Sequence, residues 1–467
     1  MAARPLFVGG TSSNAGKSWM ATALCAWLRR RGGAVAPFKA QNMSNNSYPC
    51  RQGGEIGRAQ VVQAEACGLE PETAMNPILL KPNGSGSSQV VVNGRVWKTM
   101  APRAYYEQAA ELRTHVLAAY ENLARRFDVI VIEGAGSVSE LNLRHADIVN
   151  LELVTRLRAP WLLVADIERG GVFASILGTV GLLTSDERGL LRGFAVNKFR
   201  GDMSLFEDGV RMLEARTRSQ CFGVFPFATD IAIDAEDSLA LETAPRRPGP
   251  AGARLAIIRL PCISNATDFR LLSWADWIQS PGAADYDFIV LPGTKNSIGD
   301  LRWLHSTGLS TWILAQRQRG ATVIGICGGF QMMGRRIDDP LNIDGGGSAA
   351  GLGLLPVVTE MKADKRTEVK AATTRGGVKF TGYEIHMGET ALEGTAEPFA
   401  RLDDGGADGA CLPGAIGTYL HGALENPEVC AELFGVTLGA LTSKRDQYER
   451  LADWFDRHGR GLDGLLQ

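Results

Sequence analysis

The sequence of 467 residues lacks the features that would assign it to several large classes of protein. No apolar run approaches the ~20 residues that cross a bilayer, so we expect no membrane span. The formal net charge of -2 gives no reason to expect nucleic acid or an anionic membrane as a partner. The eight cysteines do not occur at CxxC or zinc-finger spacing, which favours free thiols in a reducing cytoplasm. Residues 1–7 lead directly into a predicted strand, so we expect a cytoplasmic enzyme without a signal peptide.

The sequence does have the composition of a globular protein that is too long for a single core. Hydrophobic residues make up 45% of it, and its 55 glycines suit many turns between strands and helices. Strand-like apolar runs alternate with helical patterns, which predicts mostly parallel sheets covered on both faces. Residues 243–252 are rich in proline and glycine and are the best domain boundary. We predict an α/β protein with one domain at 1–240, a linker at 241–252 and a second domain at 253–467.

A phosphate-binding loop follows the first predicted strand, Pro5–Gly10. The run Gly10-Thr-Ser-Ser-Asn-Ala-Gly16-Lys17-Ser18 has five residues between its glycines, where the common loop has four, and an amphipathic helix follows. It retains backbone N–H groups at a helix start, a lysine for the β- and γ-phosphates and a hydroxyl for magnesium. A later strand ends in Asn-Lys-Phe-Arg200, which differs from the guanine-reading Asn-Lys-x-Asp and favours adenine. The predicted ATP-binding residues are Gly10, Thr11, Asn14, Gly16, Lys17, Ser18 and Asn197.

Other predicted strands also end in polar residues, at the edge where open α/β sheets bind their ligands. The loop from Gln41 to Ser47 is dense in amides and hydroxyls, and Glu133 ends a buried strand. Glu55 is either a first-turn acid of a helix that opens near Gly53 or a magnesium ligand, and Asp147 is either a helix cap or a site residue. We predict magnesium ligands at Ser18, Glu55 and Glu133, and substrate contacts at Gln41, Asn42, Asn45, Asp147 and Asp166.

The second predicted domain contains a sharp strand-to-helix turn at Cys327. A short apolar strand, Val323–Ile326, precedes the cysteine, and two glycines and a helical pattern follow it. Such an elbow pushes one side chain into a cleft, and the helix N-terminus favours the thiolate. His421 ends a later strand and is the natural general base and acid. This pair suits acyl transfer through a thioester, with the oxyanion held by backbone N–H groups near Gly293 and Gly328.

Two sets of motifs resemble known families. Leu291-Pro-Gly293, the elbow at Cys327 and the run Tyr419-Leu-His421-Gly together resemble class I glutamine amidotransferases. The first half resembles phosphate-loop ligases of the dethiobiotin-synthetase type, which share the longer glycine spacing. The combination resembles the cobyric acid synthase family from residue 6 to about residue 424, most specifically over residues 37–43, 53–60, 164–173 and 382–386.

This resemblance implies a reaction, its cofactors and its partners. The reaction is glutamine- and ATP-dependent amidation of the b, d, e and g carboxylates of adenosylcobyrinic acid a,c-diamide, which gives adenosylcobyric acid in cobalamin biosynthesis. Glutamine would be hydrolysed through a thioester on Cys327, and the corrinoid carboxylates would be activated as acyl phosphates. The implied partners are therefore small molecules, namely the corrinoid, glutamine and ATP, with Mg²⁺ as the metal.

One position departs from the wider amidotransferase class. That class has a glutamate two residues after the histidine to orient the ring, and this chain has Ala423 there. Glu425, Glu384 or a backbone carbonyl would have to orient His421 instead.

Two rival interpretations differ from this chain at particular loops. Cobyrinic acid a,c-diamide synthases share both domains but carry an acidic loop after the second strand, where this chain has Gln41 to Ser47. Partitioning-type ATPases carry an extra lysine at the start of the phosphate loop, which Gly9-Gly10 lacks, and have no glutaminase domain. The amide-rich loop and the elbow therefore favour the cobyric acid synthase family.

Overall fold

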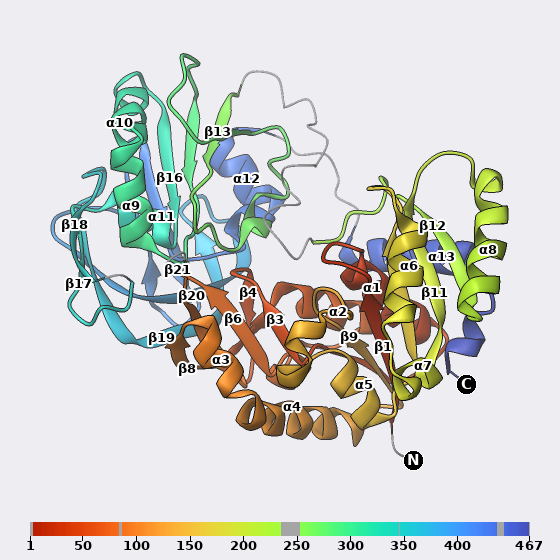
Figure 1. Cartoon of the computed structure of the whole chain (residues 1–467). Helices are drawn as coiled ribbons and strands as arrows, with labels where there is room; N and C mark the ends of the chain where they lie inside the picture. Colours follow the sequence, from red (N-terminus) through yellow and green to blue (C-terminus); the bar gives the residue numbers. More distant parts are fainter. Residues whose placement is uncertain (1–2, 84–85, 235–252, 345, 437–442, 467) are drawn as a thin grey trace.

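The computed structural model describes residues 3–83, 86–234, 253–344, 346–436 and 443–466. It contains two α/β halves that meet at a shared interface (Figure 1). Strand order and pairing confirm the predicted fold class, two α/β units with mostly parallel central sheets. The predicted linker at 241–252 lies outside the described residues.

A six-stranded sheet with the order β12-β11-β10-β1-β9-β2 forms the centre of the first half, and every neighbouring pair in it is parallel. Its central strands are buried on both faces, which explains why they occur as continuous apolar runs in the sequence. The strands are β1 (Arg4–Gly10), β2 (Val35–Phe38), β9 (Val129–Glu133), β10 (Trp161–Asp166), β11 (Leu191–Phe199) and β12 (Gln220–Pro226).

Helices cover both faces of this sheet, because alternate residues of each strand face opposite layers. Leu6 and Val8 of β1 pack with α1 and α2, whereas Phe7 packs with α4, α5, α6 and α8 on the other face. The helices are α1 (Lys17–Arg30), α2 (Arg58–Cys67), α3 (Pro102–Glu107), α4 (Ala109–Ala124), α5 (Leu151–Leu157), α6 (Val172–Gly181), α7 (Ser185–Leu190) and α8 (Glu207–Thr217). The short 3-10 helices are η1 (Thr73–Met75), η2 (Leu141–Ala146) and η3 (Met203–Phe206).

Two small sheets extend the first half toward the second. One has the order β3-β6-β7-β8, and the other is the antiparallel pair β4–β5. The expected helix near Gly53 is wrong, because Glu55 lies in β5 and α2 begins only at Arg58. Pairing with β4 satisfies the backbone groups of β5 and overrides the helical pattern. The strands are β3 (Gln41–Met43), β4 (Ser47–Pro49), β5 (Glu55–Gly57), β6 (Ile78–Pro82), β7 (Ser88–Val92) and β8 (Arg95–Met100).

A second six-stranded sheet, with the order β14-β13-β15-β16-β24-β23, forms the centre of the second half. It is parallel except for β23, and β16 ends directly before Cys327. Its strands are β13 (Leu255–Ile258), β14 (Asp276–Ile278), β15 (Phe288–Leu291), β16 (Thr322–Ile326), β23 (Ala410–Leu412) and β24 (Ala415–Thr418). The helices of this half are α9 (Ser297–Ser306), α10 (Leu309–Gln318), α11 (Gly328–Met333) and α12 (Pro427–Phe434), with the 3-10 helices η5 (Ala266–Phe269) and η6 (Ala423–Glu425).

A third sheet lies beside the second one and brings its longest strands to the interface between the halves. β19 and β20 pair over most of their length, and β20 packs beside β4 of the first half (Figure 1). This contact places the second half directly against the predicted substrate loop. The strands of the third sheet are β17 (Arg336–Asp339), β18 (Gly347–Ala350), β19 (Val357–Thr374), β20 (Lys379–Leu392), β21 (Ala400–Leu402) and β22 (Ala407–Asp408).

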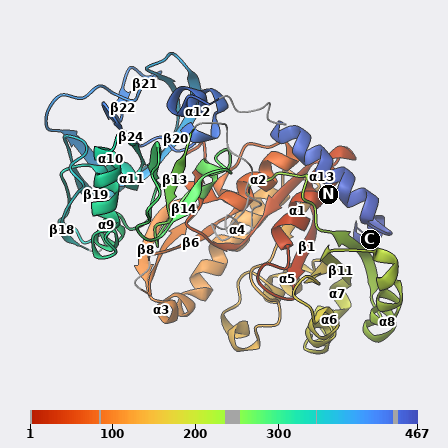
Figure 2. The ribbon, with the colours of Figure 1, turned by 90° about the horizontal axis from the view of Figure 1, so that it is seen from above.

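The last α-helix, α13 (Lys444–His458), returns to the first half and packs along α1 (Figure 2). The 3-10 helix η7 (Leu462–Leu466) follows it. Trp454 and Phe455 of α13 contact Phe225 of β12 within one buried cluster. The predicted second domain, residues 253–467, includes this helix, whereas its packing joins it to the first half. The sequence does not predict this packing, because an amphipathic pattern does not reveal which sheet a helix covers.

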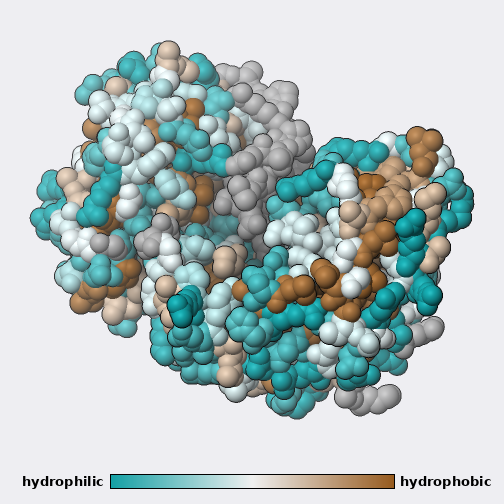
Figure 3. Space-filling view, viewed as in Figure 1, coloured by the Kyte–Doolittle hydropathy of each residue, from teal (hydrophilic) through white to brown (hydrophobic). Residues whose placement is uncertain are grey.

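Most of the surface seen in Figure 3 is hydrophilic. The larger hydrophobic patches on this face lie over the right-hand lobe, around α6 and α8, where Leu182, Leu205 and Met212 are exposed. Within the described ranges, no helix combines the length and the apolar character needed to span a bilayer.

Candidate active site

The predicted phosphate loop lies at the carboxyl end of β1 and the N-terminus of α1. Gly16 has φ 97°, and a Cβ atom there would lie 2.0 Å from Nδ2 of Asn197. Asn197 donates to the carbonyl oxygen of Ala15 at 3.0 Å, and the N–H of Thr11 donates to Val164 at 3.0 Å. These bonds hold the loop around a helix N-terminus, which is an arrangement that binds phosphate. The side chain of Asn197 therefore packs against the loop at Ala15 and Gly16.

The side chain of Lys17 lies across this loop. Its Nζ donates to the carbonyl oxygens of Ser12 at 3.0 Å and Gly136 at 2.8 Å. A Cβ atom on Gly10 would lie 2.9 Å from Cδ of Lys17, so the first glycine leaves room for the lysine. Asn14 adopts a positive φ of 60° within the loop. The lysine and both predicted glycines thus belong to one local structure.

Two of the three predicted magnesium ligands are in direct contact. Ser18 Oγ donates to Oε1 of Glu133 at 2.8 Å. Glu133 is fully buried, and it also accepts from Nζ of Lys39 at 2.9 Å and from Nε2 of Gln63 at 2.5 Å. The lysine compensates a carboxylate charge that burial alone would penalise. Lys39 is not among the predicted site residues, although it directly follows the end of β2.

The third predicted ligand, Glu55, lies in a different cluster. Its carboxylate accepts from Lys81 Nζ and from Ser47 Oγ, each at 2.8 Å, and it also pairs with Lys365 of the second half. Burial opposes its ionisation, but Lys365 and Lys81 hold the pKa of Glu55 well below its usual value. Burial lowers the pKa of Lys365 to about 7.

Among the described residues, Glu55 contacts neither Ser18 nor Glu133. The same part of the chain holds no group of three or more His, Cys, Asp or Glu side chains that could bind a metal ion. The structure therefore separates Glu55 from the Ser18–Glu133 pair. The partners of Glu55 are lysines, which compensate its negative charge in place of a metal ion.

The predicted substrate loop lies on the side of the first half that faces the second. Gln41 accepts from the hydroxyl of Tyr105 at 2.5 Å, and Asn42 donates to Oε1 of Gln60 at 3.0 Å. The Oδ1 atom of Asn45 has no hydrogen-bond partner among the described residues, and Asn45 borders a cavity between the halves. Of these three side chains, Asn45 has the most capacity left for a ligand.

The two predicted aspartates support backbone structure. Asp147 accepts from the N–H groups of Val149 at 2.9 Å and Asn150 at 2.8 Å ahead of α5, so the helix-cap interpretation describes it. Asp166 pairs with Lys198 at 2.9 Å, and Lys198 also donates to the carbonyl oxygen of Asn14. Asp166 therefore braces the phosphate loop through this lysine.

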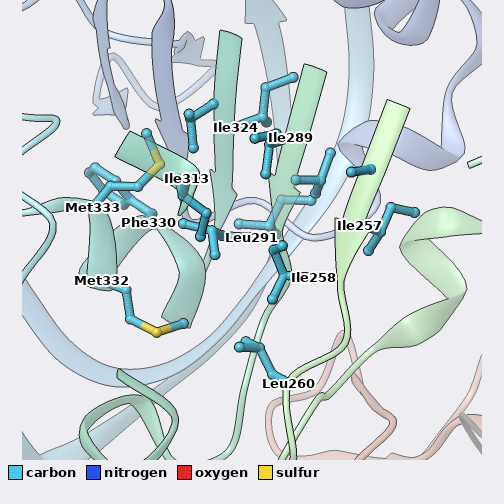
Figure 4. Close-up of a cluster of buried hydrophobic side chains, with 14 of the residues drawn as sticks. Ile257, Ile258, Leu260, Ile289, Leu291, Ile313, Ile324, Phe330, Met332 and Met333 are labelled. Atoms are coloured by element: carbon cyan, nitrogen blue, oxygen red, sulfur yellow. The ribbon is translucent and has the colours of Figure 1, made fainter. Parts of the chain in front are cut away.

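Cys327 lies between β16 and α11 with φ 51° and ψ -108°. Such a conformation is costly for a residue with a Cβ atom and is typical of a nucleophile held at an elbow. Apolar side chains from the adjoining strands and α11 pack around the elbow, including Leu291, Ile324 and Phe330 (Figure 4). This packed layer fixes the turn, and Cys327 is only 5% exposed.

His421, the predicted partner of this cysteine, is buried and has an aspartate bonded to its ring. Nδ1 of His421 lies 2.8 Å from Oδ2 of Asp268, while Oδ1 of Asp268 accepts from the N–H of Gly422 at 2.8 Å. Burial alone would lower the pKa of His421, but its electrostatic interactions, with Asp268 first and Cys327 second, raise it to about 10. The ring is therefore a cation at neutral pH. Its Nε2 makes no hydrogen bond to any described residue, which leaves this atom for the thiol and the substrate.

Asp268 makes the contact with His421 that the wider class makes with a glutamate at the position of Ala423. It lies in η5, 153 residues before His421, and no local motif marks it. Asp268 is absent from the predicted site residues for this reason. The two acids that the sequence suggested are paired elsewhere, at 3.1 and 3.6 Å: Glu425 with Arg58 and Glu384 with Arg366.

The predicted oxyanion turn lies beside the histidine and the elbow. A Cβ atom on Gly293 would lie 2.7 Å from Cε1 of His421, so only glycine lets the turn approach the ring. A Cβ atom on Gly328 would lie 3.1 Å from the backbone nitrogen of Thr294. The turn at Gly293 therefore lies against His421, and the start of α11 at Gly328 lies against the same turn, which is where the sequence predicts the oxyanion site.

One cavity connects this cysteine with the first half. Its lining includes Cys327, Lys295 and Lys365 of the second half and Asn45, Lys81 and Gln89 of the first. A small molecule released at the thiol thus enters a space that the first half also borders.

Comparison with known proteins identifies both halves. Residues 6–240 match the CobQ/CobB/MinD/ParA nucleotide binding domain, and residues 254–429 match the CobB/CobQ-like glutamine amidotransferase domain. A cobyric acid synthase of Syntrophobacter fumaroxidans is 44% identical over 497 residues, covering 98% of this chain and 97% of its own. One from Parabacteroides distasonis is 44% identical over 481 residues, covering 97% of both chains. A probable cobyric acid synthase of Methanoculleus marisnigri is 45% identical over 481 residues, covering 97% of this chain and 96% of its own.

Proposed function

The chain belongs to the cobyric acid synthase family, and we propose that its two sites divide the reaction of that family between them. It is a ligase of cobalamin synthesis that uses glutamine and ATP. We assign to it the amidation of the b, d, e and g carboxylates of adenosylcobyrinic acid a,c-diamide. The observation that carries the residue roles is the Cys327, His421 and Asp268 set in one chain with a phosphate loop.

The first half activates the corrinoid carboxylate. A carboxylate oxygen attacks the γ-phosphorus of ATP, the bond to the bridging oxygen breaks, and an acyl phosphate and ADP result. Lys17 and the N–H groups of the loop stabilise the negative charge on the phosphoryl oxygens. Lys17 already lies in the loop, where carbonyl oxygens accept its hydrogen bonds.

Ser18 and Glu133 are the residues that would hold magnesium. Their oxygens are in contact at 2.8 Å, and hydroxyl and carboxylate oxygens are hard ligands of the kind this ion takes. Magnesium commonly uses one or two protein ligands together with phosphate oxygens and water, so this pair suffices. When bound, the ion neutralises phosphate charge.

The second half releases ammonia from glutamine. The thiolate of Cys327 attacks the side-chain amide carbon, and N–H groups near Gly293 and Gly328 hold the oxyanion, where one such donor is typically worth about 3 kcal/mol. His421 gives its Nε2 proton to the departing nitrogen, the C–N bond breaks, and a glutamyl thioester remains. Neutral His421 then takes a proton from water, which hydrolyses the thioester to glutamate.

Ammonia then has to reach the acyl phosphate. The cavity that borders both Cys327 and Asn45 supports a direct route between the halves. At the first site, the nitrogen attacks the acyl carbon, the bond to the phosphate oxygen breaks, and the amide and inorganic phosphate form. Repeating the cycle at each of the four free carboxylates gives the product with four new amides.

Incubation of the enzyme with the a,c-diamide, ATP, magnesium and glutamine tests this assignment. Mass spectrometry should show four successive amidations, with glutamate released for each. A product that stops at two amidations, made only from the fully acidic precursor, would instead assign the chain to the a,c-diamide synthases.

A further inference from the structure

The ring of His421 is stacked at the end of an aromatic row that begins in the first half. Tyr48 of β4 contacts Tyr383 of β20 with ring centroids 4.9 Å apart. Tyr383 in turn stacks on His421 at 5.3 Å with an interplanar angle of 20°. Tyr383 and His421 also exchange both backbone hydrogen bonds, at 2.9 and 3.0 Å. A side chain of the first half therefore supports the face of the catalytic ring through one intermediate residue.

A second set of contacts joins the same segment of the first half to Asp268. The N–H of Ser47 donates to Oδ1 of Asn265 at 2.9 Å, and the N–H of Ala266 donates to Oδ1 of Asn46 at 3.2 Å. All four residues are buried, so water does not compete for these bonds. Asn265 has φ 51°, a conformation in which the chain turns into η5. These bonds fix the start of the short helix that carries Asp268.

We propose that Tyr48 and Asn46 are positioning residues of the glutaminase, so that the first half completes the site of the second. The inference rests on the proposed roles of Cys327 and His421. Tyr48 fixes the plane of the imidazole through Tyr383, and Asn46 fixes the acid that bonds to Nδ1. Two independent contacts from one short segment thus act on two groups, the imidazole ring of His421 and the carboxylate of Asp268. The alignment of these two groups determines the acidity of Nε2.

The charged and titratable groups around this ring define what should be measured. Asp268 and Cys327 both raise the pKa of His421, and Tyr383 lies against its face with a pKa raised mainly by burial. Asp268, Arg58 and Glu425 also act on Tyr383, and the guanidinium of Arg58 lies over the ring of Tyr48. If the ring tilts, the bond to Asp268 weakens and the pKa of His421 falls. Loss of folded protein would lower activity without this shift.

The test compares Tyr48→Leu, Tyr48→Phe and Asn46→Ala in the full chain, with glutamate release measured as a function of pH. Tyr48→Leu and Asn46→Ala should lower kcat about 10–100-fold, the range for a displaced catalytic group, and change KM for glutamine little. Both should move the alkaline limb to lower pH by about one unit, which corresponds to a weakened ion pair. Tyr48→Phe keeps the ring and should restore activity and the profile.

Two controls make the outcome decisive. Tyr120→Leu removes a buried tyrosine of the first half that packs on Phe38, far from the stack in sequence and on another element, and should keep the wild-type profile. Equal damage by Tyr48→Phe and Tyr48→Leu, or lowered activity with an unshifted profile, would overturn the proposal. Cys327→Ser run in parallel tests the premise separately, because glutamate release by that variant would contradict the proposed function itself.

Discussion

The phosphate-loop site and the glutaminase site are built in opposite ways. The phosphate-loop site lies mostly within one loop, Gly10–Ser18, and its other residue, Glu133, comes from the neighbouring strand β9. The second brings together Cys327, His421 and Asp268 from three separate segments, with further support across the interface between the halves. A contiguous site depends on local backbone geometry, whereas an assembled site depends on how the domains pack. Substitutions in the two sites should therefore differ in which nitrogen source they affect.

The largest effect is expected in the contiguous site. Lys17→Ala should abolish amidation with either glutamine or ammonium as the nitrogen source, because the carboxylate must be activated before any nitrogen can be used. Product masses measured with each source provide the check, and exposed Lys98→Ala is the charge-removal control. Near-normal synthesis from ammonium by Lys17→Ala would exclude residues 10–18 as the ATP site.

The next effect concerns Asp268 in the assembled site. Asp268→Asn should lower the glutaminase rate by ~10²–10⁴-fold, because the acid-base step loses its oriented and charged imidazole. It should leave ammonium-driven synthesis near the wild-type rate. Initial rates of glutamate release and of amidation from ammonium would show this split, and equal losses in both would contradict it.

The same variant has a defined pH dependence. Asp268 and Cys327 raise the pKa of His421 from 6.5 to about 10. The protonated His421 therefore contributes to the free energy of unfolding below pH 6.5, and this contribution is lost as the pH rises through about 10. Asp268→Asn removes one negative charge and should lower that pKa. The alkaline limb of glutaminase activity should then move to lower pH, and an unmoved limb would remove Asp268 from this role.

Glu133 and Glu55 provide a matched pair of buried acids. Glu133→Gln should weaken the response to magnesium about 10–100-fold, the range seen when a metal site loses part of its support. Glu55→Gln should leave the magnesium titration unchanged, because its partners are Lys81 and Lys365. Removing one member of such a buried ion pair typically lowers the free energy of unfolding by about 3–5 kcal/mol, so Glu55→Gln should unfold at a lower temperature than the wild type. Equal magnesium titrations of the two variants would contradict the separation of the acids.

The smallest effect is expected in substrate choice. Amide side chains donate and accept at once, which suits a corrinoid whose a and c positions are already amides. Asn42→Asp or Asn45→Asp should narrow the preference for the a,c-diamide over the acidic precursor by one to two orders of magnitude, since an unpaired polar group costs roughly 1–3 kcal/mol. Competition between the two corrinoids measures this directly, and an unchanged ratio would remove the loop from substrate recognition.

The difference between the two sites also explains what sequence could predict. Lys17, Ser18 and Cys327 lie in motifs whose neighbours dictate their geometry, and the structure places them at a phosphate loop and at an elbow. The position of Glu55 near an expected helix start predicts a magnesium ligand, but Glu55 lies in β5, which pairs with β4, and it contacts lysines of both halves. Local pattern carries no information about such pairing.

Residues that act across the fold were missed for the same reason. Asp268 has no motif of its own, and it reaches His421 because η5 packs beside η6. The C-terminal helix α13 is amphipathic, yet only the packed structure shows that its apolar face covers the first sheet. The contact of Asp268 with His421 and the packing of α13 both join segments that are far apart in the chain. Composition and local spacing do not predict such contacts.

The most direct test of the central claim is Cys327→Ser assayed with two nitrogen sources. Glutamine-driven amidation and glutamate release should disappear, while amidation driven by high ammonium should continue near the wild-type rate, because activation at the phosphate loop does not use the thiol. Loss of both activities in a folded variant, or continued use of glutamine, would contradict the division of the reaction between two sites.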